Sequence, residues 1–248
     1  MMSRVRPRGG PRRWKRFTSM ISLNMAMTLD GKVARPDGRW HGISSPRDRA
    51  RMDEIRGEHQ AIIAGKNSVL NDDPNLLPAG ENPPLPILLA RGSLYPLDRR
   101  VFNQSRVPPL VLINRTLREN PRWESADTGG NGDPSDSVDY FRRLENVADV
   151  LWLEHADFHP ERLFALLGNR GLDRILLETG PVFNYPVVQK DLLDVLYLTL
   201  TPFLFGQPDL PGIVDGPGPL PGFDRKLWRL ERAEPIEEEV FLKYRRQR

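Results

Sequence analysis

The 248-residue chain contains no cysteine and only 4 histidines. The absence of cysteine excludes disulfides, thiolate metal ligands and a thiol nucleophile. The small number of histidines leaves few ligands for a histidine-rich metal site. The paired His-Glu and Cys-Cys motifs of zinc deaminases are missing as well. No stretch approaches the roughly 20 apolar residues of a membrane span, and the basic N-terminus lacks the apolar segment of a secretion signal. We therefore expect a cytoplasmic protein without a metal site.

Acidic residues are absent before residue 18, where cations are instead concentrated. The cations are Arg4, Arg6, Arg8, Arg12, Arg13, Lys15 and Arg16. Because the whole chain carries +3, the remainder is mildly acidic. We predict a basic, disordered tail at 1–17 and a single domain at 18–248, since short basic runs often bind nothing. A nucleic-acid-binding arm is the less favoured alternative.

The remaining sequence alternates between apolar runs and helix signals, and its hydrophobic fraction of 39% is enough for a core. This alternation is typical of an α/β fold. Strands are expected at 19–27, 60–64, 86–90, 109–114, 148–153, 174–178, 194–202, 226–232 and 237–244. Only a short turn separates the last two, which indicates an antiparallel hairpin at a sheet edge.

Helix-start signals predict helices over 45–59, 160–169 and 181–190. Pro186 interrupts the last pattern and is expected to shorten or kink that helix. Residues 118–139 have few apolar anchors and are expected to form a mobile surface insertion. The proline- and glycine-rich stretch at 206–222 is expected to be a loop.

Polar residues interrupt the first predicted strand. Ser22, Asn24 and Thr28 lie in an otherwise apolar run, and Asp30-Gly31 is an ordinary turn pair. A polar side chain in a buried strand costs free energy unless it has a partner. These residues therefore either satisfy neighbouring backbone groups or face a ligand.

A second candidate site follows the strand predicted at 174–178. Glu178, Thr179 and Gly180 connect its end to the start of a predicted helix. A helix start offers free N–H groups and the positive end of the helix dipole, which suits a phosphate or pyrophosphate. By itself the signal is weak, because most strand–glycine–helix turns bind nothing.

Arg56 is a third candidate. It follows Met52 by about one helical turn, at the edge of the predicted buried stripe, so its guanidinium can reach a cleft. On the residues alone, an ion pair with Asp53 or Glu54 on the helix surface is the favoured alternative. The Asn-Asp-Asp-Pro run at 71–74 is likewise usually a turn.

Four segments together carry a family resemblance: L-N-M-A-M-T-L-D-G at 23–31, R-G-E-H-Q-A-I-I-A-G at 56–65, N-D-D-P-N-L at 71–76 and L-L-E-T-G-P at 176–181. In this order they resemble the reductase domain of riboflavin biosynthesis. The resemblance implies a dihydrofolate-reductase-like fold with a mostly parallel sheet flanked by helices, and a homodimer. It also implies NADPH-dependent reduction of the ribosyl group of a (di)aminopyrimidine ribosylamine 5′-phosphate to the ribitylamine.

The resemblance also implies roles for individual residues. NADPH contacts are expected at Ala26, Gly42, Ser68, Asp72, Gly180, Pro181, Val182, Phe183 and Asn184. Substrate contacts are expected at Asn24, Arg56, Leu76 and Glu178. Asp30 and Glu178 are the catalytic candidates, and no general acid is identified. Lys66, Arg91 and Arg115 are all candidates for binding the 2′-phosphate of the cofactor.

The chain departs from the family pattern at several positions. Pro181 offers no N–H donor, Pro78-Ala79 stands where a substrate-binding arginine is common, and Trp40 stands where many members have a small polar residue. Asn24 is similar to archaeal and fungal members rather than to bacterial ones with lysine, and it leaves open whether the substrate is deaminated. The alternatives are a reductase of another heterocycle such as a pterin, and a non-enzymatic NADPH- or nucleic-acid-binding module.

Overall fold

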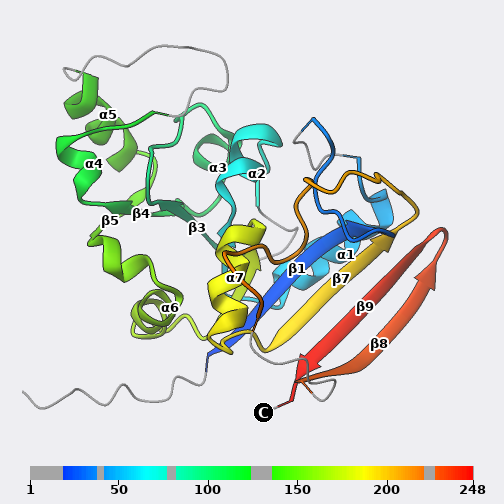
Figure 1. The fold of residues 1–248 in the computed structure, drawn as a ribbon. Coiled ribbons are helices and arrows are strands. Elements are labelled where there is room, and N and C mark those ends of the chain that lie inside the picture. Colours follow the sequence, from blue (N-terminus) through cyan, green and yellow to red (C-terminus); the bar gives the residue numbers. More distant parts are fainter. Residues whose placement is uncertain (1–18, 38–41, 77–81, 124–135, 221–226, 248) are drawn as a thin grey trace, which may run out of the picture.

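The structure is a computed structural model that describes residues 19–37, 42–76, 82–123, 136–220 and 227–247. The described strands form one sheet in the order β5-β4-β3-β2-β6-β1-β7-β9-β8 (Figure 1). The strands are β1 (Met20–Thr28), β2 (Ala61–Ala64), β3 (Leu85–Ala90), β4 (Leu110–Asn114), β5 (Asp149–Leu153), β6 (Arg174–Glu178), β7 (Val195–Thr201), β8 (Trp228–Ile236) and β9 (Glu239–Arg246). The helices are α1 (Pro46–Gly57), α2 (Lys66–Asn71), α3 (Arg100–Asn103), α4 (Thr116–Glu119), α5 (Asp136–Glu145), the 3-10 turn η1 (His155–Phe158), α6 (Pro160–Gly168) and α7 (Pro181–Gln189).

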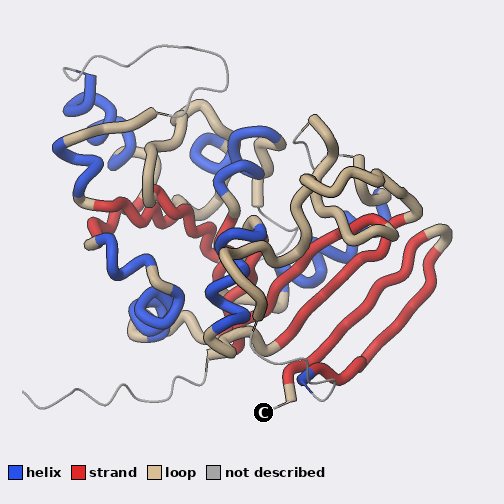
Figure 2. The backbone as a smooth tube through the Cα atoms, viewed as in Figure 1, coloured by secondary structure: helices blue, strands red, loops and turns tan. Residues whose placement is uncertain are grey.

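The sheet is parallel from β5 through β7 and becomes antiparallel where β9 pairs with β7 and with β8. Figure 2 shows this hairpin extending the sheet beyond the helices. The α/β fold with a mostly parallel sheet and an antiparallel C-terminal hairpin is therefore confirmed. The predicted tail at 1–17 lies outside the described residues.

Alternate strand residues pack on opposite faces of the sheet, as the two-residue period of a strand requires. On one face, Leu23 clusters with Leu163 of α6 and Val187 of α7. On the other face, Ile62 clusters with Ile55 of α1. All of these side chains are buried. Removing such apolar surface from water stabilises the fold by about 25 cal/mol per Å². The central strands are thus held between two helical layers.

The carboxyl ends of the central strands lie side by side in the middle of the sheet. Ala64, which ends β2, pairs with Glu178, which ends β6. Leu23 of β1 pairs with Leu177, and β1 then continues along β7 as far as Thr28. In open parallel sheets, ligands bind in the crevice outside these carboxyl ends. Segments that are far apart in the sequence meet at this edge.

Of the two effects expected of Pro186, the shortening does not occur, because α7 runs through Pro186 to Gln189, and the kink stays a prediction. Proline lacks the N–H that would bond one turn back, so its neighbours must hold the helix in place. Tyr185 and Val187 on either side of it are both buried. Tertiary packing therefore compensates for the missing hydrogen bond.

The predicted insertion at 118–139 is only partly irregular. Helix α4 extends to Glu119 and helix α5 begins at Asp136. Trp123 packs edge-to-face on Tyr140, with ring centroids 4.6 Å apart, and Tyr140 donates a hydrogen bond to the carbonyl of Tyr95 at 2.9 Å. These aromatic anchors tie both ends of the segment to the domain. Residues 124–135 lie outside the described part of the chain.

The remaining loop and helix predictions are simpler to assess. The described residues from 206 to 220 contain neither helix nor strand, as expected for a proline- and glycine-rich stretch. None of the described helices combines the length and the apolar character needed to cross a membrane.

Candidate active site

A cavity of about 200 Å³ lies where the carboxyl ends of β1, β2 and β6 face α1 and α2. Eight of the residues expected to bind cofactor or substrate line it, and they come from five separate segments of the chain: Asn24, Ala26, Gly42, Arg56, Ser68, Asp72, Leu76 and Glu178. The fold therefore gathers the separate motifs around one space. We call this space the small cavity.

Arg56 and Glu178 form a buried pair in the wall of the small cavity. Arg56 donates from Nε to Oε1 of Glu178 at 2.8 Å and from Nη2 to Oε2 at 2.7 Å. Its Nη1 also donates to Asp53 at 3.2 Å. Burial alone lowers the pKa of Arg56, but the two carboxylates more than offset this and the pKa is raised. The expected contact with Asp53 exists, yet Arg56 is only 4% exposed and is not a surface residue.

A close backbone approach connects β2 to the turn after β6. The amide of Gly65 donates to the carbonyl of Glu178 at 2.8 Å. A Cβ atom on Gly65 would lie 3.2 Å from the amide nitrogen of Gly180. Since that is tighter than ordinary side-chain contacts, glycine is the residue that allows this approach. The two strand ends thereby form one continuous wall.

A second cavity, of about 760 Å³, adjoins the first. We call it the large cavity. Ala64 and Ser68 line both spaces. The start of α7 contributes Gly180, Pro181, Val182 and Phe183 to its wall. The cations Arg35, Lys66 and Arg91 also line it. A helix start and several cations around one space favour an anionic ligand.

Of the three cations considered for a cofactor phosphate, two face the large cavity. Lys66 contacts the hydroxyl of Ser93 and lies 5.1 Å from the ring centroid of Tyr95. Arg91 lines the same wall. Arg115 does not line it, and pairs with Glu154 on the surface at 3.2 Å. The geometry therefore separates Lys66 and Arg91 from Arg115.

Asn184 is fully buried and lines neither cavity. Its Oδ1 accepts a hydrogen bond from the hydroxyl of Thr179 at 2.5 Å, and its Nδ2 donates to the carbonyl of Ile213 at 2.9 Å. The side chain thus ties the loop after β7 to the turn that precedes α7. Its position favours shaping this turn over direct contact with a ligand.

Asp30, expected as a catalytic candidate, lies outside both cavities. Its carboxylate accepts hydrogen bonds from the Thr28 hydroxyl at 2.5 Å and from the Gly206 amide at 2.8 Å. These contacts, the hydroxyl first, lower the pKa of Asp30 to about 2. A lowered pKa and a position outside these two cavities favour a structural role for this carboxylate. Asp30 thus anchors the backbone of the loop after β7, and its catalytic role stays a prediction.

The Asn-Asp-Asp-Pro segment contains an unusual backbone. Leu76 is fully buried with φ of 55°, and Asp73 has φ of 44°. Non-glycine residues seldom adopt this left-handed region, and such strain gathers at binding sites. Asp73 accepts a hydrogen bond from the amide of Arg100 at 2.7 Å, which helps to hold the segment. Leu76 is thereby placed in the wall of the small cavity.

Several lining residues of the small cavity were not expected from the sequence. Ser44, Asp48, Arg49, Met52 and Pro74 line it as well. An acid at the third position of a helix is common, and nothing in the local pattern signals that Asp48 faces a cavity. The departures at Trp40 and at Pro78-Ala79 lie outside the described residues.

Comparison with known proteins gives a consistent result. The family model of the RibD C-terminal domain matches residues 19–242. A protein of Methanothermobacter thermautotrophicus named 2,5-diamino-6-ribosylamino-4(3H)-pyrimidinone 5′-phosphate reductase is 30% identical over 230 residues, which cover 90% of this chain and 96% of that protein. A protein of the same name from Archaeoglobus fulgidus is 26% identical, covering 88% and 94%.

Solved structures show the same fold. The structure of Acinetobacter baumannii RibD, form 1, superposes with a TM-score of 0.70 at 17% identity. The match covers 93% of this chain and 58% of that one. At this level of identity the likeness concerns the fold alone. The chain therefore matches part of RibD and nearly the whole length of the archaeal reductases.

Proposed function

The chain belongs to the family of the RibD C-terminal domain, and from this premise we propose that it is a reductase of riboflavin biosynthesis. The substrate is a diaminopyrimidinone ribosylamine 5′-phosphate, whose ribosyl group is reduced to a ribityl group. The observation that carries the proposal is the near full-length similarity to two reductases named for this reaction. The gathering of the expected residues around two adjoining cavities supports it.

The cofactor we propose is NADPH, held in the large cavity and reaching past Ala64 and Ser68 into the small cavity, where the expected contacts Ala26, Gly42 and Asp72 line the wall. When bound, its nicotinamide supplies a hydride to C1′ of the open-chain imine, and the imine nitrogen takes up a proton. Lys66 and Arg91 bind the 2′-phosphate, because they are the candidate cations that line this space. The start of α7 contributes the amide of Val182, since Pro181 has no N–H and the amides of Phe183 and Asn184 bond to the Gly180 carbonyl.

The substrate occupies the small cavity, with Arg56 and Glu178 in contact with it. Three of the five N–H donors of Arg56 bind Glu178 and Asp53 among the described residues. The other two can bind phosphate or hydroxyl oxygens of the sugar chain. The pair thereby orients the acceptor carbon towards the large cavity. Holding the reacting carbons about 3–3.5 Å apart is the main requirement for hydride transfer.

The non-deaminated substrate is the one we propose. Both nearly full-length relatives are named for the 2,5-diamino compound. Reduction then precedes deamination. We further propose a cytoplasmic homodimer, which sedimentation at graded concentrations will test.

The deciding experiment measures oxidation of NADPH with enzymatically made ribosylaminopyrimidine phosphates, deaminated and non-deaminated, as separate substrates. We expect turnover of the non-deaminated compound. Turnover of the deaminated one alone would reverse the order of steps. Binding of NADPH without turnover of either compound would reject the proposed substrate in favour of another heterocycle.

A second experiment tests the cofactor. Lys66→Gln removes one cation from the proposed phosphate site, so KM for NADPH should rise about tenfold while KM for NADH stays unchanged. Arg115→Gln is the matched control, because Arg115 does not line the cavity. Equal effects of Lys66→Gln on both cofactors would place the 2′-phosphate elsewhere.

A further inference from the structure

Asp48 is a carboxylate in the wall of the small cavity that the reaction as described does not use. It lies in the first turn of α1 and is 8% exposed. The hydroxyl of Thr199 on β7 donates to its Oδ1. Its own amide donates to the hydroxyl of Ser45 at 3.2 Å. The backbone of Asp48 is thus held by the helix cap, and its carboxylate is held by Thr199 of the sheet.

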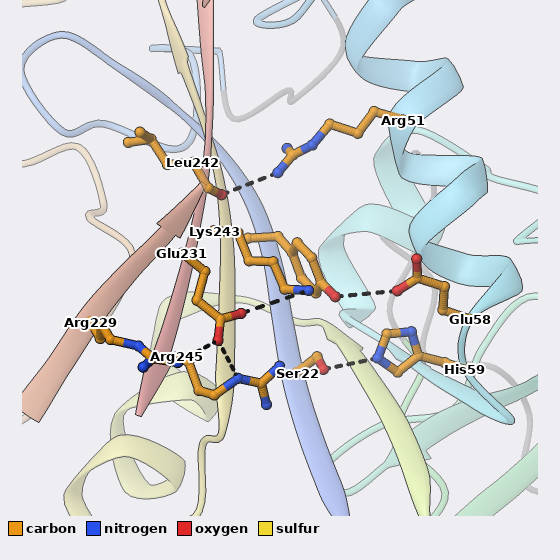
Figure 3. A network of polar contacts seen from close by, with 10 residues as sticks. Ser22, Arg51, Glu58, His59, Arg229, Glu231, Leu242, Lys243 and Arg245 are labelled. Carbon is orange, nitrogen blue, oxygen red and sulfur yellow. Dashed lines mark hydrogen bonds and ion pairs between the residues drawn. The ribbon is translucent and has the colours of Figure 1, made fainter. Parts of the chain in front are cut away.

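Arg51 reinforces this arrangement. Its Nη1 donates to Thr199 Oγ1 at 3.0 Å and lies 4.0 Å from Oδ1 of Asp48. Its Nη2 donates to the carbonyl of Leu242 at 3.1 Å, a contact that Figure 3 shows reaching from α1 to the hairpin. The guanidinium also lies 4.7 Å from the ring centroid of Phe241. Arg51 is therefore held between Thr199 and the hairpin, beside Asp48.

The two oxygens of Asp48 differ in their surroundings. Oδ1 faces Thr199 and Arg51. Oδ2 accepts no hydrogen bond from the part of the chain that the structure describes, and it is not sealed from solvent. Because the residue lines the small cavity, a ligand there can engage the carboxylate. An acid in the first turn of a helix interacts favourably with the helix dipole even when it is exposed to solvent. That interaction therefore does not account for the burial of Asp48.

We propose that Asp48 accepts a hydrogen bond from the 2-amino group of the pyrimidine and thereby makes the site selective for the non-deaminated ring. A carboxylate only accepts hydrogen bonds. The ring edge that carries N3–H and the 2-amino group presents two parallel donors, as a guanidinium does, and a carboxylate matches it. This inference rests on the proposed function of the same cavity.

The deaminated ring presents a different edge to Asp48. Deamination replaces the 2-amino group with a carbonyl, so an acceptor faces an acceptor and N3–H is flanked by oxygens on both sides. With the deaminated ring, the buried carboxylate loses the 2-amino donor and faces the lone pairs of the 2-carbonyl oxygen, which disfavours binding. Discrimination by an unpaired polar group is stronger than discrimination by shape. Asp48 is thus a specificity-determining residue and takes no part in hydride transfer.

The test compares the two rings in wild type and in Asp48→Asn. The probes are 2,5,6-triaminopyrimidin-4-one and 5,6-diaminouracil, measured by calorimetry, together with kcat/KM for the two ribosylamine phosphates. We expect Asp48→Asn to reduce the preference for the 2-amino ring by about 10- to 100-fold, since one charge-assisted contact is lost. Asparagine keeps an oxygen for Thr199, so the fold is retained.

Ser45→Ala is the matched control for a structural role. It removes the helix cap and one partner of Glu239, which Ser45 Oγ contacts at 2.6 Å, and should lower the melting temperature without changing the ring preference. An unchanged ring preference in Asp48→Asn overturns the inference, and so does an equal change in Ser45→Ala. If the triamino ring binds selectively through Asp48 but neither phosphate is turned over, the reductase proposal fails and the assignment of Asp48 stands.

Discussion

Two arginine–carboxylate clusters in this molecule have nearly the same geometry and opposite surroundings. In the small cavity, Arg56 Nη2 lies 2.7 Å from Glu178, and the two side chains are 5% and 14% exposed. On the hairpin, Arg245 Nε lies 2.6 Å from Glu231, and these are 41% and 21% exposed. Figure 3 shows Glu231 between Arg229, Lys243 and Arg245 on the outer strands. The two distances are therefore too similar to tell which cluster contributes more to stability or to binding.

Burial decides what each cluster contributes. Ions removed from water lose hydration, and a buried pair recovers that loss only through good mutual contacts. An exposed pair keeps much of its hydration and gains little from pairing. Burying this pair of charges at a cavity wall thus costs free energy of hydration, which favours a role of the pair in binding. The hairpin cluster places charges along the free edge of the sheet, where they discourage pairing with other strands.

The largest expected effect comes from breaking the buried pair. Glu178→Ala leaves the guanidinium of Arg56 buried without its bidentate partner, so the free energy of unfolding should fall by about 3 kcal/mol. Turnover should fall with it, because Arg56 loses its orientation. Urea unfolding followed by tryptophan fluorescence measures the first quantity, and NADPH oxidation the second. Full turnover in this variant would remove Glu178 from the essential set.

A double variant separates stability from function at the same site. Arg56→Leu combined with Glu178→Leu removes both charges, and apolar replacements of buried pairs are often neutral in stability. We expect most of the lost stability to return while turnover stays absent. If the double variant is as unstable as the single one, the cluster serves the fold rather than the ligand.

An intermediate effect is expected from His59, which is buried. Its Nδ1 donates to the carbonyl of Ile55 at 2.7 Å, and its Nε2 accepts from the hydroxyl of Ser22 at 2.9 Å. Burial lowers the pKa of His59 below its ordinary value of 6.5. The unfolded chain therefore binds a proton more readily than the folded one. This contribution is fully present above pH 6.5 and is lost as the pH falls through the folded pKa.

The measurement is the free energy of unfolding against pH, in wild type and in His59→Gln. Wild type should lose stability from about pH 6.5 downwards, and the variant should lose less over the same interval. Parallel curves for the two proteins would show that another group controls the acid response.

The sequence predicted which residues gather around one cavity better than how they pair with one another. The motif around Arg56 and the turn at Glu178 identified residues that meet in the small cavity. Their mutual pairing joins positions 122 residues apart and depends on sheet register. On the residues alone, an ion pair of Arg56 with Asp53 or Glu54 is therefore the favoured interpretation. Most strands and the hairpin followed from apolar patterns, because those patterns reflect burial directly.

Local patterns also missed contacts between distant residues. Asp30 belongs to a motif that lines the small cavity, but its own carboxylate accepts hydrogen bonds from the loop after β7. Asp48 looked like an ordinary helix acid until β7 brought Thr199 beside it. Helix α7 continues through Pro186 because its flanking residues are buried. In each case a distant contact outweighed the local signal.

The smallest expected effect comes from Glu231→Gln on the hairpin, and it completes the contrast with the buried pair. The hydrogen bond from Arg245, followed by the one from Arg229, lowers the pKa of Glu231 below its usual range. Its contribution is present above the usual range and is lost as the pH falls through the lowered pKa. Because the cluster is exposed, the loss in unfolding free energy should stay under about 1 kcal/mol and vanish near 1 M salt, where charges are screened within about 3 Å. A loss as large as that of Glu178→Ala, or one that resists salt, would mean that the hairpin carboxylate is as poorly hydrated as the cavity pair and that exposure does not separate the two clusters.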